Sequence, residues 1–263
     1  MEAMTFPAPG AVTLEISIGA GDVRVREQAG AVSLRVTGEQ DPDQVTIESS
    51  EEPDGSLRIT VTERRRGISG WKRRKGLDIT VDTPAETTLD IDGGSVDLRS
   101  KGHVAGLRFA SGSGDARLDD VADDVVVKGA SGDVRVRHVG GQLRVHLASG
   151  DVFADDVGGG ATVRTASGDI ALGTLAGESS ITSLSGDVVI HRAEPHSLAV
   201  QAVSGDVEVG IAPGVPAVLD VSSLSGDTRS ELDVSSTPSS GEAPPLDLKV
   251  NTVSGDVRIR RAT

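Results

Sequence analysis

A Ser-Gly-Asp triplet recurs along the chain and constrains the fold more than any other feature. The triplets begin at Ser113, Ser131, Ser149, Ser167, Ser185, Ser204, Ser225 and Ser254. The first five follow a strict 18-residue period, and the later ones are spaced progressively more widely. A fixed internal period this short indicates one small structural unit stacked on copies of itself.

Each repeat divides into two nine-residue halves with the same pattern of apolar residues. Counted from the Ser of the triplet, apolar residues fall at positions 4, 6, 9, 13, 15 and 18, and in the four strict copies only Ser179 departs from this. In the second strict copy they are Val134, Val136, Val139, Leu143, Val145 and Ala148. Such alternation predicts two short strands per repeat, separated by small or Gly-rich corners such as Gly140-Gly141.

The pattern therefore predicts an all-β chain, folded as a β-solenoid with about 18 residues per coil and two facing sheets. We expect the six apolar positions to fill the space between the sheets. The composition suits a thin core, because the chain has 33 Gly and 11 Pro for turns but only three Phe, one Trp and no Tyr.

The first 92 residues alternate like strands without keeping the 18-residue period. We interpret residues 1–92 as an irregular β start and cap, continuous with the repeat region 93–263; a separate small β domain is the alternative. Within Gly94–Leu98, which resembles a coil start, Ser95 is expected to take the place of the Asp. The Ser/Pro-rich stretch 235–245 is predicted to be a loop.

The repeat of Ser-Gly-Asp-Val type with alternating strands resembles the DUF4097 family, β-strand-repeat proteins labelled as adhesins. The resemblance is close over about residues 90–263 and looser before them. It implies a β-solenoid and no established molecular activity. Many relatives carry a leader or a membrane anchor.

The aspartates of the triplets form one candidate site. They are Asp115, Asp133, Asp151, Asp169, Asp187, Asp206, Asp227 and Asp256. Stacked in register they would place like charges about 5 Å apart, which costs on the order of 1 kcal/mol per neighbouring pair in water. We expect each carboxylate to accept backbone N–H groups in its own corner. A row of Ca²⁺ ions is the alternative, and Arg24, Arg117, Arg135, Arg229 and Arg258, each two residues after an Asp, are expected to screen the row.

A basic segment, residues 64–75, is the second candidate site. Its basic residues are Arg64, Arg65, Arg66, Lys72, Arg73, Arg74 and Lys75, and it contains Trp71, the only tryptophan. It lies between two strand-like runs, 57–61 and 77–81, and is predicted to be an exposed hairpin loop. Such a segment could bind anionic lipid, phosphates or an acidic protein partner; the alternative is a solvated loop that balances nearby acids.

No catalytic signature is present, so the sequence predicts no enzyme, no cofactor and no metal site. The chain lacks Cys, a Gly-x-Ser-x-Gly elbow and a phosphate loop. The five histidines share no repeat position and are expected to be solvated. Adjacent acids such as Asp119-Asp120 and Asp155-Asp156 resemble a glycosidase pair only superficially, since they lie at corners without aromatic platforms.

The leading functional prediction is a non-enzymatic scaffold that presents its faces to unknown protein partners. The alternatives are a self-assembling filament resembling bactofilins and, with an export signal, a cell-surface adhesin. The net charge of −14 disfavours nucleic acid as a partner. Without a signal peptide or an 18-residue apolar run, we expect a cytoplasmic location. The chain ends half-way through a coil, but Arg260 and Arg261 are expected to discourage end-to-end pairing, which predicts a monomer or small homo-oligomer.

Overall fold

The computed structural model describes residues 3–8, 10–38, 45–64, 76–194, 196–232 and 245–262. These residues are built from β-strands joined by short corners, and no helix occurs among them. They form two compact units, Met1–Asp133 and Val134–Thr263. The all-β prediction is confirmed.

The first unit contains ten strands. They are β1 (Met4–Phe6), β2 (Val12–Glu27), β3 (Val32–Thr37), β4 (Val45–Glu51), β5 (Leu57–Glu63), β6 (Leu77–Thr83), β7 (Thr87–Val104), β8 (Gly106–Ser113), β9 (Ala116–Val121) and β10 (Val125–Ser131).

The second unit contains thirteen strands. They are β11 (Val134–Val139), β12 (Leu143–Ser149), β13 (Val152–Val157), β14 (Ala161–Ser167), β15 (Ile170–Leu175), β16 (Ser179–Ser185), β17 (Val188–Ala193), β18 (Ser197–Ser204), β19 (Val207–Ile211), β20 (Ala217–Ser225), β21 (Thr228–Ser230), β22 (Leu246–Ser254) and β23 (Val257–Arg261).

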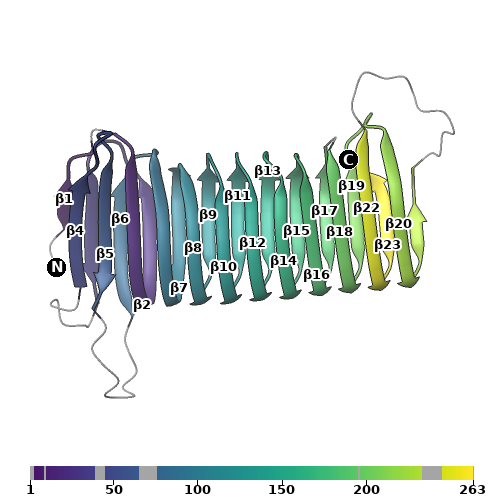
Figure 1. Cartoon of the computed structure of the whole chain (residues 1–263), viewed down its shortest axis with the longest axis horizontal. Coiled ribbons are helices and arrows are strands. Elements are labelled where there is room, and N and C mark those ends of the chain that lie inside the picture. Colours follow the sequence, from purple (N-terminus) through teal and green to yellow (C-terminus); the bar gives the residue numbers. More distant parts are fainter. Residues whose placement is uncertain are drawn as a thin grey trace, which may run out of the picture. The chain divides into compact units, whose positions relative to one another are not determined.

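In the second unit every other strand pairs in parallel, as a solenoid requires. β11, β13, β15, β17 and β19 follow one another in one layer, and β12, β14, β16 and β18 do so in the other. Val134 lies opposite Val152, which in turn lies opposite Ile170, so each coil advances the register by one full repeat. Figure 1 shows these strands side by side. The predicted β-solenoid with 18-residue coils is confirmed.

The core uses five of the six predicted apolar positions, and the prediction for the sixth is wrong. Position 18 faces outward: Ala148 is exposed, and Leu184 is 50% exposed. Position 17 faces inward instead, with Leu147 8% exposed and Ser183 fully buried. The second strand of each coil keeps strict alternation at positions 13, 15 and 17, because successive side chains of a strand point to opposite faces.

The last coils do not stack in sequence order. The final coil, β22 and β23, pairs with β18 and β19 on one side and with β20 and β21 on the other. Figure 1 shows β22 between β18 and β20. The C-terminal strands are therefore paired on both sides, contrary to the expectation from the sequence. Arg260 lies inside the stack, where its Nε is 2.6 Å from Glu208 Oε1.

The first unit is organised around two long strands that turn a corner. β2 and β7 each contribute to both layers, and they pair in parallel from Val12 opposite Thr87 to Arg26 opposite Lys101. On the other side of β2, β5 pairs with its first half and β6 with its second half. β4 then adds to β5, and β3 and β1 add beyond β6, all antiparallel. Strand β7 runs without interruption through residues 92 and 93, where the sequence analysis divided the irregular start from the repeat region.

Candidate functional site

The triplet aspartates bond from coil to coil. The backbone N–H of Asp133 donates to Asp115 Oδ1 at 3.0 Å, and that of Asp115 donates to Asp97 Oδ1 at 2.9 Å. In the second unit the same bonds, 2.8 to 2.9 Å long, link Asp151, Asp169, Asp187, Asp206, Asp256 and Asp227 in spatial order. From the sequence we expected each carboxylate to accept N–H groups of its own corner. In the structure the N–H group that donates to it belongs to the neighbouring coil. Asp97, not Ser95, takes the Asp place in the coil start at Gly94–Leu98.

The other two residues of the triplet also serve the stacking. In the second unit, the N–H of Gly168 donates to the carbonyl oxygen of Ser185 in the next coil at 3.1 Å. A Cβ on Gly168 would lie 2.2 Å from the carbonyl oxygen of Gly150, and the φ of Gly168 is +127°. Only glycine allows coils to approach this closely in that conformation. The triplet is therefore a corner that ties each coil to the next.

Arginines compensate part of the negative charge of this row, as the sequence suggested. Arg117 lies 2.9 Å from Asp115, Arg229 lies 3.2 Å from Asp227, and Arg24 lies within 3.4 Å of both Asp22 and Asp78. The other two arginines make further contacts. Arg135 stacks over the ring of Phe153 at 4.7 Å, and Arg258 lies 3.6 Å from Glu231.

The basic segment is an insertion into the corner of a coil. β5 follows the first half of β2 up to Thr62 opposite Ser17, and β6 follows the second half from Leu77 opposite Gly21. Between these two pairings β2 has three residues, 18–20, whereas the chain has fourteen residues between Thr62 and Leu77. The hairpin prediction is wrong, because β5 and β6 pair with β2 and not with each other.

The structure describes the entrance and the exit of this insertion. Glu63 Oε2 accepts the backbone N–H of Gly19 at 2.6 Å, and Arg64 is exposed. Gly76 lies so close to Gly21 that a Cβ there would be 2.9 Å from its Cα. The remaining predicted residues, Arg65, Arg66, Trp71, Lys72, Arg73, Arg74 and Lys75, lie outside the described residues.

Two histidines, expected to be solvated, pair with carboxylates of the following coil. His103 Nδ1 lies 2.9 Å from Asp120 Oδ2, and His138 Nδ1 lies 2.9 Å from Asp156 Oδ2. The acids at these corners therefore belong to inter-coil contacts. Burial lowers the pKa of the half-buried His196, an effect that the backbone and the charge of Glu194 oppose.

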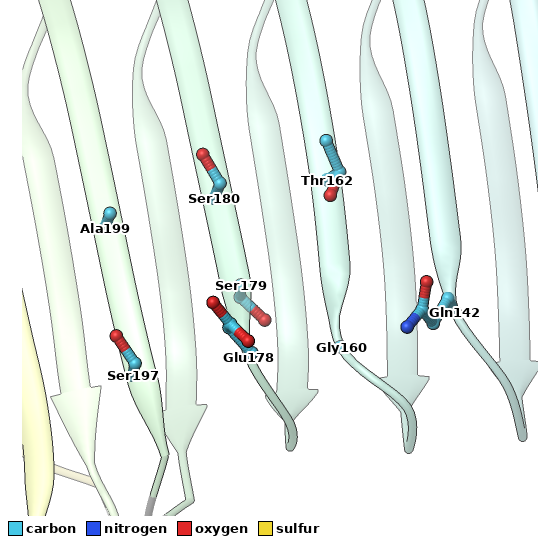
Figure 2. A pocket seen from close by; sticks show the side chains of 8 residues that line it. All are labelled: Gln142, Gly160, Thr162, Glu178, Ser179, Ser180, Ser197 and Ala199. Carbon is cyan, nitrogen blue, oxygen red and sulfur yellow. The ribbon is translucent and has the colours of Figure 1, made fainter.

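The outer face of β12, β14, β16 and β18 carries a shallow pocket of about 300 Å³. Figure 2 shows its lining, in which Thr162, Ser180 and Ala199 project from successive strands, with Gln142 and Glu178 at one end. Short hydroxyl side chains create the hollow, because they fill less space than their neighbours. Sequence reasoning did not find this pocket, and the small residues at alternate positions are its only signal.

An aliphatic row on the same outer face was also missed. It consists of Leu184, Val203, Val253 and Leu224, each directly before the Ser of a triplet, and these side chains are 50%, 44%, 46% and 83% exposed. The flanking registers align them across β16, β18, β22 and β20. The signal was present at position 18, which the sequence analysis assigned to the core.

Among the residues that the structure describes, no group of three or more His, Asp or Glu is arranged to hold a metal ion. None of the described segments forms a helix with the length and apolarity needed to cross a membrane.

The comparison with protein families decides the affiliation of the chain. The model named Toastrack DUF4097 matches residues 12–260. The chain belongs to the Toastrack DUF4097 family. This confirms the resemblance drawn from the repeats and extends it over the irregular N-terminal strands.

Solved structures with a similar fold come from Parabacteroides distasonis and Bacteroides fragilis. A "putative lipid binding protein" from Parabacteroides distasonis is 16% identical with a TM-score of 0.47, covering 100% of this chain and 96% of that one. A "putative adhesin" from the same species is 12% identical with a TM-score of 0.45, covering 98% and 96%. Another from Bacteroides fragilis is 15% identical with a TM-score of 0.38, covering 99% and 96%. No curated protein matches the chain.

Proposed function

We propose that this Toastrack protein is a non-enzymatic binding scaffold that docks on anionic membrane surfaces through the basic segment 64–75. The observation that carries the proposal is the insertion of this segment between β5 and β6, both of which keep their register with β2. The solenoid therefore does not need these residues for its own pairing. A run of seven basic residues around the only Trp is suited to an anionic surface, since each basic residue near lipid contributes about 1 kcal/mol.

The structural use of the acidic residues supports a role without catalysis. The triplet Asp is the repeated side chain that could act as an acid or base. Its carboxylate instead accepts a backbone N–H group of the neighbouring coil. One acid of each adjacent pair, Asp120 and Asp156, lies 2.9 Å from His103 and His138 respectively. These carboxylates have positions in the stack that account for their presence. A cytoplasmic location, with docking on the inner leaflet and on protein partners of unknown identity, is part of the proposal.

Vesicle flotation tests the docking proposal. The full chain is mixed with phosphatidylcholine vesicles with and without phosphatidylserine, at low and high salt. We expect flotation only with phosphatidylserine and at low salt, because screening weakens exposed charge contacts. A variant with Arg66, Trp71, Lys72, Arg73, Arg74 and Lys75 changed to Ala should stay at the bottom of the gradient.

A second variant controls for net charge. It carries Ala in place of five exposed basic residues outside the segment, namely Lys101, Arg108, Lys128, Arg164 and Arg258. This control should float like the unmodified chain. If it loses flotation as fully as the segment variant does, total charge and not the segment drives binding. If the unmodified chain never floats, the membrane proposal is wrong and the segment must be tested against acidic proteins.

A further inference from the structure

Strand β20 has one edge without a partner among the described strands. Its other edge pairs with β22 from Ala217 opposite Leu246 to Ser225 opposite Ser254. The inward side chains Leu219 and Val221 are only half-buried, whereas Leu248 and Val250 beside them in β22 are fully buried. The aliphatic side chains of β20 are thus covered by a neighbouring coil on one side only.

The second strand of the same coil is different. Thr228 and Ser230 of β21 lie opposite Val257 and Ile259 of β23, which are 1% and 0% exposed. At these inward places β21 therefore has hydroxyl groups, which water can satisfy. The layer of β21 ends in polar side chains, while the layer of β20 ends in aliphatic ones.

The outer face of β20 is also apolar at both ends. Val218 is 59% exposed, and Leu224, where the aliphatic row ends, is 83% exposed. Edge strands of soluble proteins usually carry charges, prolines or bulges that prevent pairing with another chain. The single charge within β20, Asp220, lies 3.7 Å from Lys249 of β22. Apart from this one paired charge, the strand has neither a charge nor a proline to protect its edge.

We propose that β20 is the interface of a homodimer, in which it pairs antiparallel with β20 of a second copy about a two-fold axis at Val221. This register pairs all nine residues of the strand. Val218 faces the partner's Leu224, and Asp220 faces the partner's Ser222, so aliphatic groups meet and no two carboxylates oppose each other. The aliphatic row then continues from Leu224 onto Val218 of the second copy.

Self-complementarity is what selects a second copy as the occupant. A two-fold axis at Asp220 would place two carboxylates opposite each other, and an axis at Leu219 would place Asp220 opposite Val218. Only the axis at Val221 avoids both contacts and uses the full strand. Such an interface is isologous and closes with two copies, so it produces a dimer and no filament.

Sedimentation velocity of the full chain over a range of concentrations tests the dimer. We expect a dimer that is lost in the variant V218K/L224K, because lysines would then meet across the interface. Both side chains are largely exposed, so the fold should tolerate the change, and circular dichroism verifies this. The matched control L184K/V203K adds the same charge to the same row away from the edge and should remain dimeric.

Other outcomes overturn the proposal. A monomer at every concentration shows that the edge has no second copy as its partner. A dimer that persists in V218K/L224K places the contact elsewhere. A dimer lost equally in L184K/V203K assigns association to the row and not to the strand edge.

Disulfide cross-linking tests the register independently, since the chain has no cysteine. In Val221→Cys the two sulfur-bearing residues would face each other, with Cα atoms roughly 4.5 to 5.5 Å apart. In the control Leu219→Cys they would be four residues apart along the paired strands, or about 13 Å, beyond the reach of a disulfide. We expect a covalent dimer from the first variant only. Equal cross-linking of both variants, or of neither, rules out this register.

Discussion

Each residue of the triplet contributes a separate group to the contact between coils. Ser supplies a carbonyl oxygen, Gly allows the close approach, and Asp supplies a carboxylate oxygen that accepts the next Asp N–H. The charge of the carboxylate is incidental to this bond, because an amide oxygen can accept the same N–H. The acceptor, and not the charge, should therefore determine the stability of the corner.

Asp115 allows this distinction to be tested. In Asp115→Ala the N–H of Asp133 loses its acceptor, which should reduce the free energy of unfolding by about 1 kcal/mol. In Asp115→Asn the acceptor remains, so most of that loss should be absent. Both variants remove the ion pair with Arg117, and the difference between them isolates the hydrogen bond. Urea denaturation measures both values, and equal losses would show that the charge matters instead.

His196 should make stability depend on pH. Burial lowers its pKa below the ordinary 6.5, so the unfolded chain binds this proton more readily than the folded chain. The contribution is fully present above pH 6.5 and decreases as the pH falls through the window between 6.5 and the lowered pKa. Denaturation across that window should show a steeper loss for the unmodified chain than for His196→Gln. Parallel curves would contradict the assignment.

Among the elements, the repeat predicts the strands well and their outer and inner faces less well. Regular spacing and alternation are sufficient to locate β11 to β18 and their register. Position 18 was misassigned because Ala148 is small and apolar, while the true inward position holds Thr165 and Ser183 in other coils. A polar residue at an inward position hides the alternation that apolar residues would show. Thr165, for example, is 4% exposed and donates to the carbonyl oxygen of Ser167 at 3.0 Å.

Lysine substitutions at two neighbouring positions of β12 test whether position 17, and not position 18, faces the core. Leu147→Lys puts a charge into the core and should cost more than about 2 kcal/mol, because a buried charge without a partner is strongly destabilising. Ala148→Lys changes an exposed residue and should alter the free energy of unfolding by less than about 0.5 kcal/mol. Thermal and urea denaturation compare the two. The reverse order would restore the assignment made from the sequence.

Calcium should not change the thermal stability of the protein through the row of triplet aspartates. One oxygen of each carboxylate that links two coils is already bonded to a backbone N–H at 2.8 to 3.0 Å, whereas Ca²⁺ needs several oxygen ligands around one point. We therefore expect the same Tm in excess Ca²⁺ and in excess chelator. A rise in Tm with Ca²⁺ that saturates would identify a metal site in the row.

At the scale of the whole molecule, the order of the coils follows from their side chains and not from their place in the sequence. The coil of β22 and β23 presents Leu246, Leu248, Val250, Val257 and Ile259 inward and is covered on both sides. The coil of β20 and β21 presents Thr228 and Ser230 in one layer and lies beyond it. The more apolar coil gains more from being covered twice. The difference in apolar content between the two coils can be seen in the sequence. The repeat period by itself, however, suggests that the coils stack in chain order.

A truncation after residue 245 tests this order. In chain-order stacking, removal of β22 and β23 would expose only the last coil and leave β20 and β21 protected. In the observed order it removes the only described partner of β20 and of β21, so both strands should lose their protection. Hydrogen exchange followed by mass spectrometry should show rapid exchange over residues 217–230 in the truncated chain and unchanged protection over β14 to β17. Slow exchange of 217–230 would mean that β20 pairs with β18 instead, and that the last coil is interchangeable with its neighbour.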